Sequence, residues 1–79
     1  MRIKIDKLQE LERLDFDNRT TSFIKFISWD LYIRIDAKDG YIEFYRENDY
    51  GEDVKIYDYV PQWAFLTMVD LINKGYIEE

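Results

Sequence analysis

The chain has 79 residues, of which 47% are hydrophobic and 18% aromatic, and this content predicts one small folded domain rather than a disordered segment. Its 17 acidic and 11 basic residues give a net charge of −6, which opposes binding to nucleic-acid phosphates and favours a basic partner. The absence of cysteine and histidine excludes disulfides, thiolate metal sites and the usual catalytic dyads built from these residues.

The beginning of the chain predicts a brief strand, a short helix and a loop. Hydrophobic and basic residues alternate at positions 2–5, which is typical of an edge strand. Leu8, Leu11 and Leu14 then recur every third residue behind an Asp6 cap, so we expect a helix over residues 7–15. The polar stretch that follows, residues 17–22, is rich in turn formers and predicts a loop.

Strand periodicity is clearest at residues 27–36, where hydrophobic residues occupy every second position. One face holds Ile27, Trp29, Leu31, Ile33 and Ile35, and the other holds Ser28, Asp30, Tyr32, Arg34 and Asp36. The preceding residues 23–26 are also assigned to a strand, with a helical turn as the alternative. The sequence therefore predicts that Trp29 faces the core and that Tyr32 faces away from it.

Two further strands complete a predicted antiparallel meander. Asp39 and Gly40 favour a tight hairpin turn, after which residues 41–46 alternate as the next strand. An acidic turn at residues 47–53 then leads into a last strand at residues 54–60. These strands share one aliphatic face and one face rich in tyrosine.

The end of the chain predicts an amphipathic helix over residues 61–73, beginning at Pro61 and ending near Gly75. Its expected core-facing residues are Ala64, Phe65, Met68, Val69, Leu71 and Ile72. Trp63 and Leu66 are expected on the side that meets water. The predicted fold is a single compact α+β domain over residues 1–79, with a short N-terminal helix, a three- to four-stranded antiparallel meander, and a C-terminal helix packed on one sheet face.

The predicted contact surface combines the tyrosine-rich sheet face with the acidic turn and the outer side of the last helix. Amphipathic rings beside carboxylates suit a surface that binds another protein. The candidate partner-binding residues are Tyr32, Tyr41, Glu43, Tyr45, Glu47, Asp49, Tyr50, Glu52, Asp53, Tyr57, Trp63 and Leu66. The alternative interpretation is that the tyrosines are strand formers, covered by the N-terminal helix as a second layer of core.

These observations predict a non-enzymatic, protein-binding module that needs no cofactor and no metal. Carboxylates spaced along a hairpin can imitate duplex phosphates, so the expected partner is a basic, nucleic-acid-handling protein that the chain inhibits or regulates. A phage-type inhibitor of a nuclease, such as an anti-CRISPR protein, is the sharpest form of this hypothesis. The acidic turn lacks the twelve-residue spacing of a calcium loop, and a sheet of this size offers no deep cleft for a catalytic carboxylate pair.

Two other functions remain open from the sequence. The chain could form a homodimer through Trp63 and Leu66 or through an unpaired sheet edge. It could also stack single-stranded nucleic acid on the tyrosines, although the surrounding negative charge makes direct nucleic-acid binding unfavourable. The early charged residues do not form a signal peptide, and the longest apolar stretch, residues 63–72, is too short to span a bilayer, so we expect a cytoplasmic protein without a membrane segment.

Overall fold

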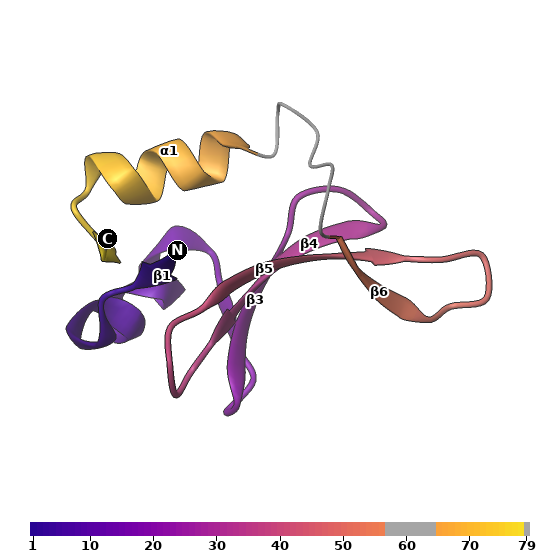
Figure 1. Ribbon diagram of the computed structural model, residues 1–79, viewed down its shortest axis with the longest axis horizontal. Coiled ribbons are helices and arrows are strands. Elements are labelled where there is room, and N and C mark those ends of the chain that lie inside the picture. The colour runs from indigo at the N-terminus through magenta and orange to yellow at the C-terminus, as the bar shows by residue number, and fades with distance from the viewer. Residues whose placement is uncertain (57–64, 79) are drawn as a thin grey trace.

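Two antiparallel sheets and two helices make up residues 1–56 and 65–78, the part of the chain that the computed structural model describes (Figure 1). The larger sheet has the order β2-β3-β4-β5-β6, so each strand pairs with its neighbour in sequence. Its strands are β2 (Asp17–Asn18), β3 (Ser22–Phe26), β4 (Leu31–Asp36), β5 (Ile42–Glu47) and β6 (Asp53–Ile56). The smaller sheet joins β1 (Arg2–Ile3) to β7 (Ile77–Glu78), and the helices are η1 (Ile5–Leu14) and α1 (Phe65–Asn73). The predicted α+β class and antiparallel meander are confirmed.

The meander has more strands than the sequence predicts, for two local reasons. The expected loop at residues 17–22 contains β2, which pairs with β3. The expected long strand at residues 27–36 is interrupted, because the backbone N–H groups of Ile27 and Ser28 both donate to the Leu31 carbonyl, at 2.8 and 3.1 Å. Residues 23–26 do belong to a strand, β3. The interruption removes Trp29 from the core face, so the prediction that it is buried is wrong.

The N-terminal helix is a 3₁₀ helix that begins two residues earlier than predicted. Its leucines recur at intervals of three, which is the repeat of a 3₁₀ helix rather than an α-helix. Leu8 and Leu11 are buried on this stripe. The predicted Asp6 cap is wrong, because Asp6 lies inside the first turn and Lys4 occupies the cap position without a side-chain hydrogen bond.

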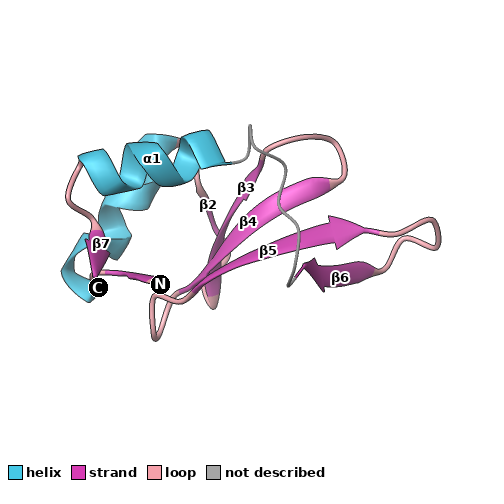
Figure 2. Ribbon diagram, turned by 45° about the horizontal axis from the view of Figure 1, so that its top comes forward, coloured by secondary structure: helices cyan, strands magenta, loops and turns pink. Residues whose placement is uncertain are grey.

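One hydrophobic cluster collects side chains from both helices and from the aliphatic sheet face. Its buried members are Ile3, Leu8, Leu11, Phe16, Phe23, Ile33, Ile35, Met68 and Leu71. Figure 2 shows the two helices gathered at one end of the molecule, from which the strands of the larger sheet extend. Because η1 contributes to this cluster, it packs with the aliphatic side, and the alternative in which it covers the tyrosine-rich face is wrong.

Helix α1 matches the predicted helix over the residues that the structure describes. Met68 and Leu71 are buried as expected, and Leu66 is 70% exposed on the outer side. Val69 and Ile72, which were also expected to face the core, are about half exposed. The predicted first turn, including Pro61 and Trp63, lies outside the described residues. No helix among the described residues is long and apolar enough to cross a membrane.

Strand β1 links the two sheets and holds the two ends of the chain together. The Ile3 N–H donates to the Gly40 carbonyl at 2.7 Å, in the turn between β4 and β5. On the other side, Arg2 pairs with Glu78 of β7 at 3.1 Å. The predicted edge strand at the beginning of the chain is therefore paired on both sides.

Gly40 is the position at which this junction tolerates no side chain. Its φ is +76°, and a Cβ there would collide with the carbonyl oxygen of Ile3. We expect Gly40→Ala to lower the free energy of unfolding by roughly 3 kcal/mol, of which about 1–2 kcal/mol comes from the left-handed backbone and the rest from the collision. Urea denaturation measures the loss.

Gly75→Ala is the matched control for this substitution. Gly75 has a similar φ of +74°, but a Cβ there would meet nothing within 4 Å. The control should therefore lose only the backbone contribution. Equal losses in the two variants would show that the contact between the β4–β5 turn and β1 does not restrict this position.

Candidate functional site

The tyrosine-rich face of the sheet contains a stacked row of rings. Tyr32 lies opposite Phe26 on one side and opposite Tyr45 on the other in the strand register. The ring centroids of Tyr32 and Phe26 are 5.0 Å apart, and those of Tyr32 and Tyr45 are 5.4 Å apart with nearly parallel planes. Tyr32 is only 6% exposed. The prediction that Tyr32 belongs to an exposed contact surface is therefore wrong, because its ring is part of the packing of this face.

The Tyr32 hydroxyl ties this row to β6. Burial raises its pKa to about 12. Asp53 adds to this rise, because it accepts a hydrogen bond from the hydroxyl and places a negative charge nearby. Both effects favour the neutral phenol. Tyr32 therefore stabilises the fold in its protonated form.

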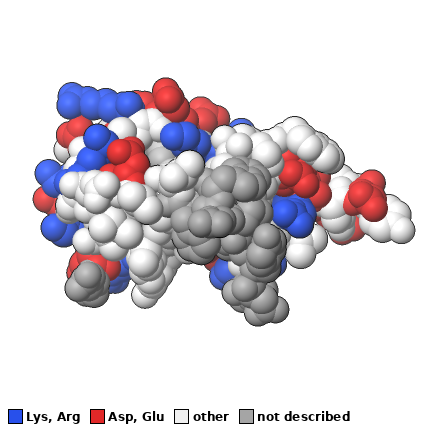
Figure 3. All heavy atoms as spheres, turned by 90° about the horizontal axis from the view of Figure 1, so that it is seen from above, with Lys and Arg blue, Asp and Glu red and all other residues white. Residues whose placement is uncertain are grey.

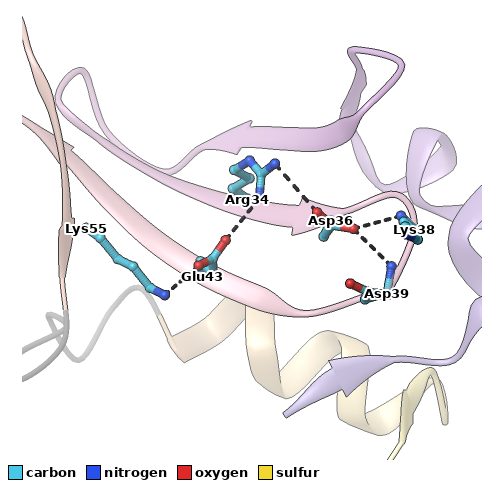
Figure 4. Close-up of polar contacts among 6 residues, drawn as sticks. All are labelled: Arg34, Asp36, Lys38, Asp39, Glu43 and Lys55. Carbon is cyan, nitrogen blue, oxygen red and sulfur yellow. Dashed lines mark hydrogen bonds and ion pairs between the residues drawn. The ribbon is translucent and has the colours of Figure 1, made fainter.

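A row of alternating charges crosses the same face (Figure 4). Glu43 on β5 accepts a hydrogen bond from Arg34 of β4 at 2.9 Å and also pairs with Lys55 of β6. Arg34 extends the row to Asp36, at 3.7 Å. The hydrogen bond from Lys55, opposed in part by burial, lowers the pKa of Glu43. Glu43, a predicted partner-binding residue, is thus engaged within the sheet.

Asp36 ends this charge row at the turn between β4 and β5. One of its carboxylate oxygens accepts hydrogen bonds from the backbone N–H groups of Lys38 and Asp39, at 2.8 and 2.9 Å. These two hydrogen bonds lower the pKa of Asp36, and the positive charge of Arg34 adds to the effect. The row therefore joins the middle of the sheet to the turn that β1 contacts.

The acidic turn, residues 47–53, projects from the opposite end of the sheet and is ordered by one side chain. The Asn48 side-chain oxygen accepts hydrogen bonds from the backbone N–H groups of Tyr50 and Glu52, both at 2.9 Å. Glu47, Asp49, Glu52 and Asp53 are all exposed, as the sequence predicts, and Tyr50 is 87% exposed. In Figure 3 this narrow end shows mainly red and white spheres, whereas blue spheres gather at the end that carries the chain termini.

The tryptophan turn, residues 27–30, lies beside the acidic turn. The Asp30 carbonyl accepts a hydrogen bond from the Glu47 N–H at 2.8 Å, and the Asp30 carboxylate lies 3.7 Å from Arg46. Trp29 is 87% exposed on this turn. A groove of about 660 Å³ runs between the two turns, and its lining residues are Trp29, Asp30, Arg46, Glu47, Asn48, Asp49 and Gly51.

Five residues that line this groove are absent from the predicted contact surface: Trp29, Asp30, Arg46, Asn48 and Gly51. Trp29 is the aromatic residue among them. Its place in a period-two pattern assigned it to the core, although Ser28 and Asp30 on either side are residue types that favour turns. In the structure the Ser28 hydroxyl donates to the Asp30 carboxylate at 2.9 Å and closes the turn beneath Trp29. The flanking turn formers were thus the available clue.

The remaining predicted site residues do not gather at this groove. Tyr41 lies at the other end of β5, half exposed, with the Arg2 guanidinium 5.9 Å from its ring centroid. Leu66 is exposed on α1. Tyr57 and Trp63 lie outside the described residues. Among the described residues, no group of three or more acidic side chains is placed to hold a metal ion.

Comparisons of this chain with protein-family models, curated proteins and solved structures found no match.

The raised pKa of Tyr32 predicts a loss of stability in alkali. A phenol with a folded-state pKa of about 12 and an ordinary pKa of 10.0 contributes stability that is complete below pH 10 and declines as the pH rises toward 12. We expect wild type to lose roughly 1–2 kcal/mol more than Tyr32→Phe between pH 9 and pH 11.5, as measured by urea denaturation. Tyr50→Phe, which alters an exposed ring, should behave as wild type. An identical alkaline slope in Tyr32→Phe would contradict this assignment.

The charge row predicts that Glu43 contributes to the free energy of unfolding and that this contribution is lost at acid pH. A carboxyl whose pKa is lowered by folding contributes stability above its unfolded pKa of 4.5, and this contribution is lost as the pH falls. Glu43→Gln should therefore cost about 1 kcal/mol at pH 7, with a difference that narrows toward pH 3. Glu47→Gln, on the exposed turn, is the control and should change little at either pH. A pH-independent cost of Glu43→Gln would mean that packing, and not charge, is responsible.

Proposed function

We propose that this chain is a non-enzymatic, protein-binding module that inhibits or regulates a basic, nucleic-acid-handling protein in the cytoplasm. The observation that carries the proposal is the pairing of an exposed acidic turn with an exposed tryptophan at one end of the molecule. Tryptophan and tyrosine dominate the residues that anchor protein interfaces, and exposed carboxylates attract a basic surface.

The distribution of charge supports a contact at this end. Residues 27–56 hold eight acidic and four basic side chains. Three of the four basic residues already form ion pairs within this part of the chain. Arg34 pairs with Asp36 and Glu43, Arg46 with Asp30, and Lys55 with Glu43. Among the described residues, no lysine or arginine pairs with the carboxylates of the acidic turn at Glu47, Asp49 or Glu52. Their negative field is therefore available to steer a basic partner toward the turn.

Order in the two turns also supports the proposal. Asn48 organises the acidic turn, and the hydrogen bond from Glu47 to Asp30 joins it to the tryptophan turn. A surface that is ordered before binding loses less conformational entropy when the complex forms. Exposed carboxylates carried on an ordered backbone can occupy the positions of duplex phosphates on a protein that reads phosphates, and so exclude nucleic acid. In its sharpest form, the partner is a nuclease and the chain is a phage-type inhibitor, such as an anti-CRISPR protein.

Charge reversal tests the proposal. A tip variant that combines Glu47→Lys, Asp49→Lys, Glu52→Lys and Asp53→Lys should lose its partner, because the phosphate-like charges are replaced by repulsive ones. The measurement is affinity capture from host lysate, followed by competition with duplex DNA for the captured basic protein. Binding should weaken as salt rises.

The matched control reverses four exposed carboxylates elsewhere, in Asp6→Lys, Glu12→Lys, Asp39→Lys and Asp70→Lys. It changes the net charge by the same amount and should still capture the partner. Circular dichroism checks that both variants fold. If the tip variant retained the same basic protein as wild type, charge imitation by the acidic turn would be refuted.

A homodimer is the second candidate, and a separate observation favours it. Leu66, Val69 and Ile72 are exposed along α1, and Met1 is exposed beside them in an apolar groove shared with Ile72. Sedimentation at high and low salt distinguishes this candidate, because an apolar dimer persists at high salt. The single-stranded nucleic-acid binder has less support, since Tyr32 is buried and both Arg34 and Lys55 are engaged in the charge row.

A further inference from the structure

We infer that the groove between the tryptophan turn and the acidic turn seats an arginine side chain of the partner. This inference rests on the proposed function, because it names the chemical group by which the basic partner is recognised. The three properties that carry it are the charge of the groove, the exposed indole and the shape of the guanidinium group.

The groove has an excess of negative charge. Its ionisable lining residues are three carboxylates, Asp30, Glu47 and Asp49, and one cation, Arg46. Arg46 lies 3.7 Å from Asp30, so its charge is directed to that carboxylate. Glu47 and Asp49 have no ion pair with any described residue. A cation that enters the groove therefore meets two carboxylates that no lysine or arginine of the described residues pairs with.

The second property is the tryptophan that lines the groove. An exposed indole face attracts cations through its quadrupole, and tryptophan is the strongest of the aromatic residues in this respect. Trp29 is 87% exposed although its turn is held by several hydrogen bonds. The hydrogen bonds hold the backbone of the tryptophan turn, and Trp29 lines the same groove as the carboxylates.

The third property selects arginine over lysine. A guanidinium group is planar, so it can stack on an indole while its N–H groups donate to carboxylates at its edge. An ammonium group is not planar, so it cannot stack on the indole in this way, and it is more strongly hydrated. Proteins that bind duplex DNA use arginine widely for phosphates and guanine, so the expected partner presents this group.

Binding of two blocked, dye-labelled peptides tests the inference. One is Gly-Arg-Gly-Arg-Gly and the other is Gly-Lys-Gly-Lys-Gly, with fluorescence anisotropy measured at low salt. We expect wild type to bind the arginine peptide about fivefold more tightly than the lysine peptide. Trp29→Ala should remove this preference without unfolding the chain, because the side chain is exposed.

Tyr50→Ala is the matched control, since Tyr50 is equally exposed but does not line the groove. It should keep the arginine preference. Equal binding of both peptides to wild type, or equal effects of Trp29→Ala and Tyr50→Ala, would overturn the inference. In either case, the proposed function would still be supported if wild type captured a basic protein that the tip variant did not. Failure to bind either peptide would also overturn the inference, and the capture experiment would then decide the proposed function separately.

Discussion

The register of β4 between β3 and β5 decides which side chains enter the core and which reach the opposite face. Leu31, Ile33 and Ile35 are completely buried on one side of this strand. Tyr32 and Arg34 alternate with them and belong to the ring stack and the charge row. Because side chains alternate strictly along a strand, a slip of one residue would exchange the two sets. The ring stack and the charge row both span β4 and β5, so a slipped pairing would lose both of them together with the core.

The same register places the groove. Residue Arg46 of β5 pairs with Leu31, the first residue of β4, so the turn before β4 and the turn after β5 emerge next to each other. The Glu47–Asp30 hydrogen bond continues this pairing beyond the strands. Trp29 and the carboxylates of the acidic turn therefore owe their proximity to the ladder itself. The geometry of the groove is thus a direct extension of the sheet, and this small domain presents an ordered surface there.

Periodicity in the sequence was sufficient for the regular parts of this fold. It placed Ile33 and Ile35 in the core and the hairpin turn at Gly40, because alternation and a glycine at positive φ are local properties of the chain. It failed at Trp29, where hydrogen bonds from Ile27 and Ser28 to Leu31 take the backbone out of the sheet while the pattern continues. It failed for a different reason at Tyr32. Alternation predicts on which side of the sheet a side chain lies, but not whether other side chains cover it there. The exposed acidic turn was foreseen, but its closeness to Trp29 depends on the hydrogen bond from Glu47 to Asp30, a tertiary contact that no local pattern contains.

The pairing of β1 with β7 has a practical consequence for work on this protein. Both ends of the chain emerge together at the pole opposite the tryptophan turn (Figure 1). A tether attached to either end therefore leads away from the groove. A chain anchored to a sensor chip or a bead through Met1 would therefore present its tryptophan outward, in the orientation that a test of the proposed partner requires.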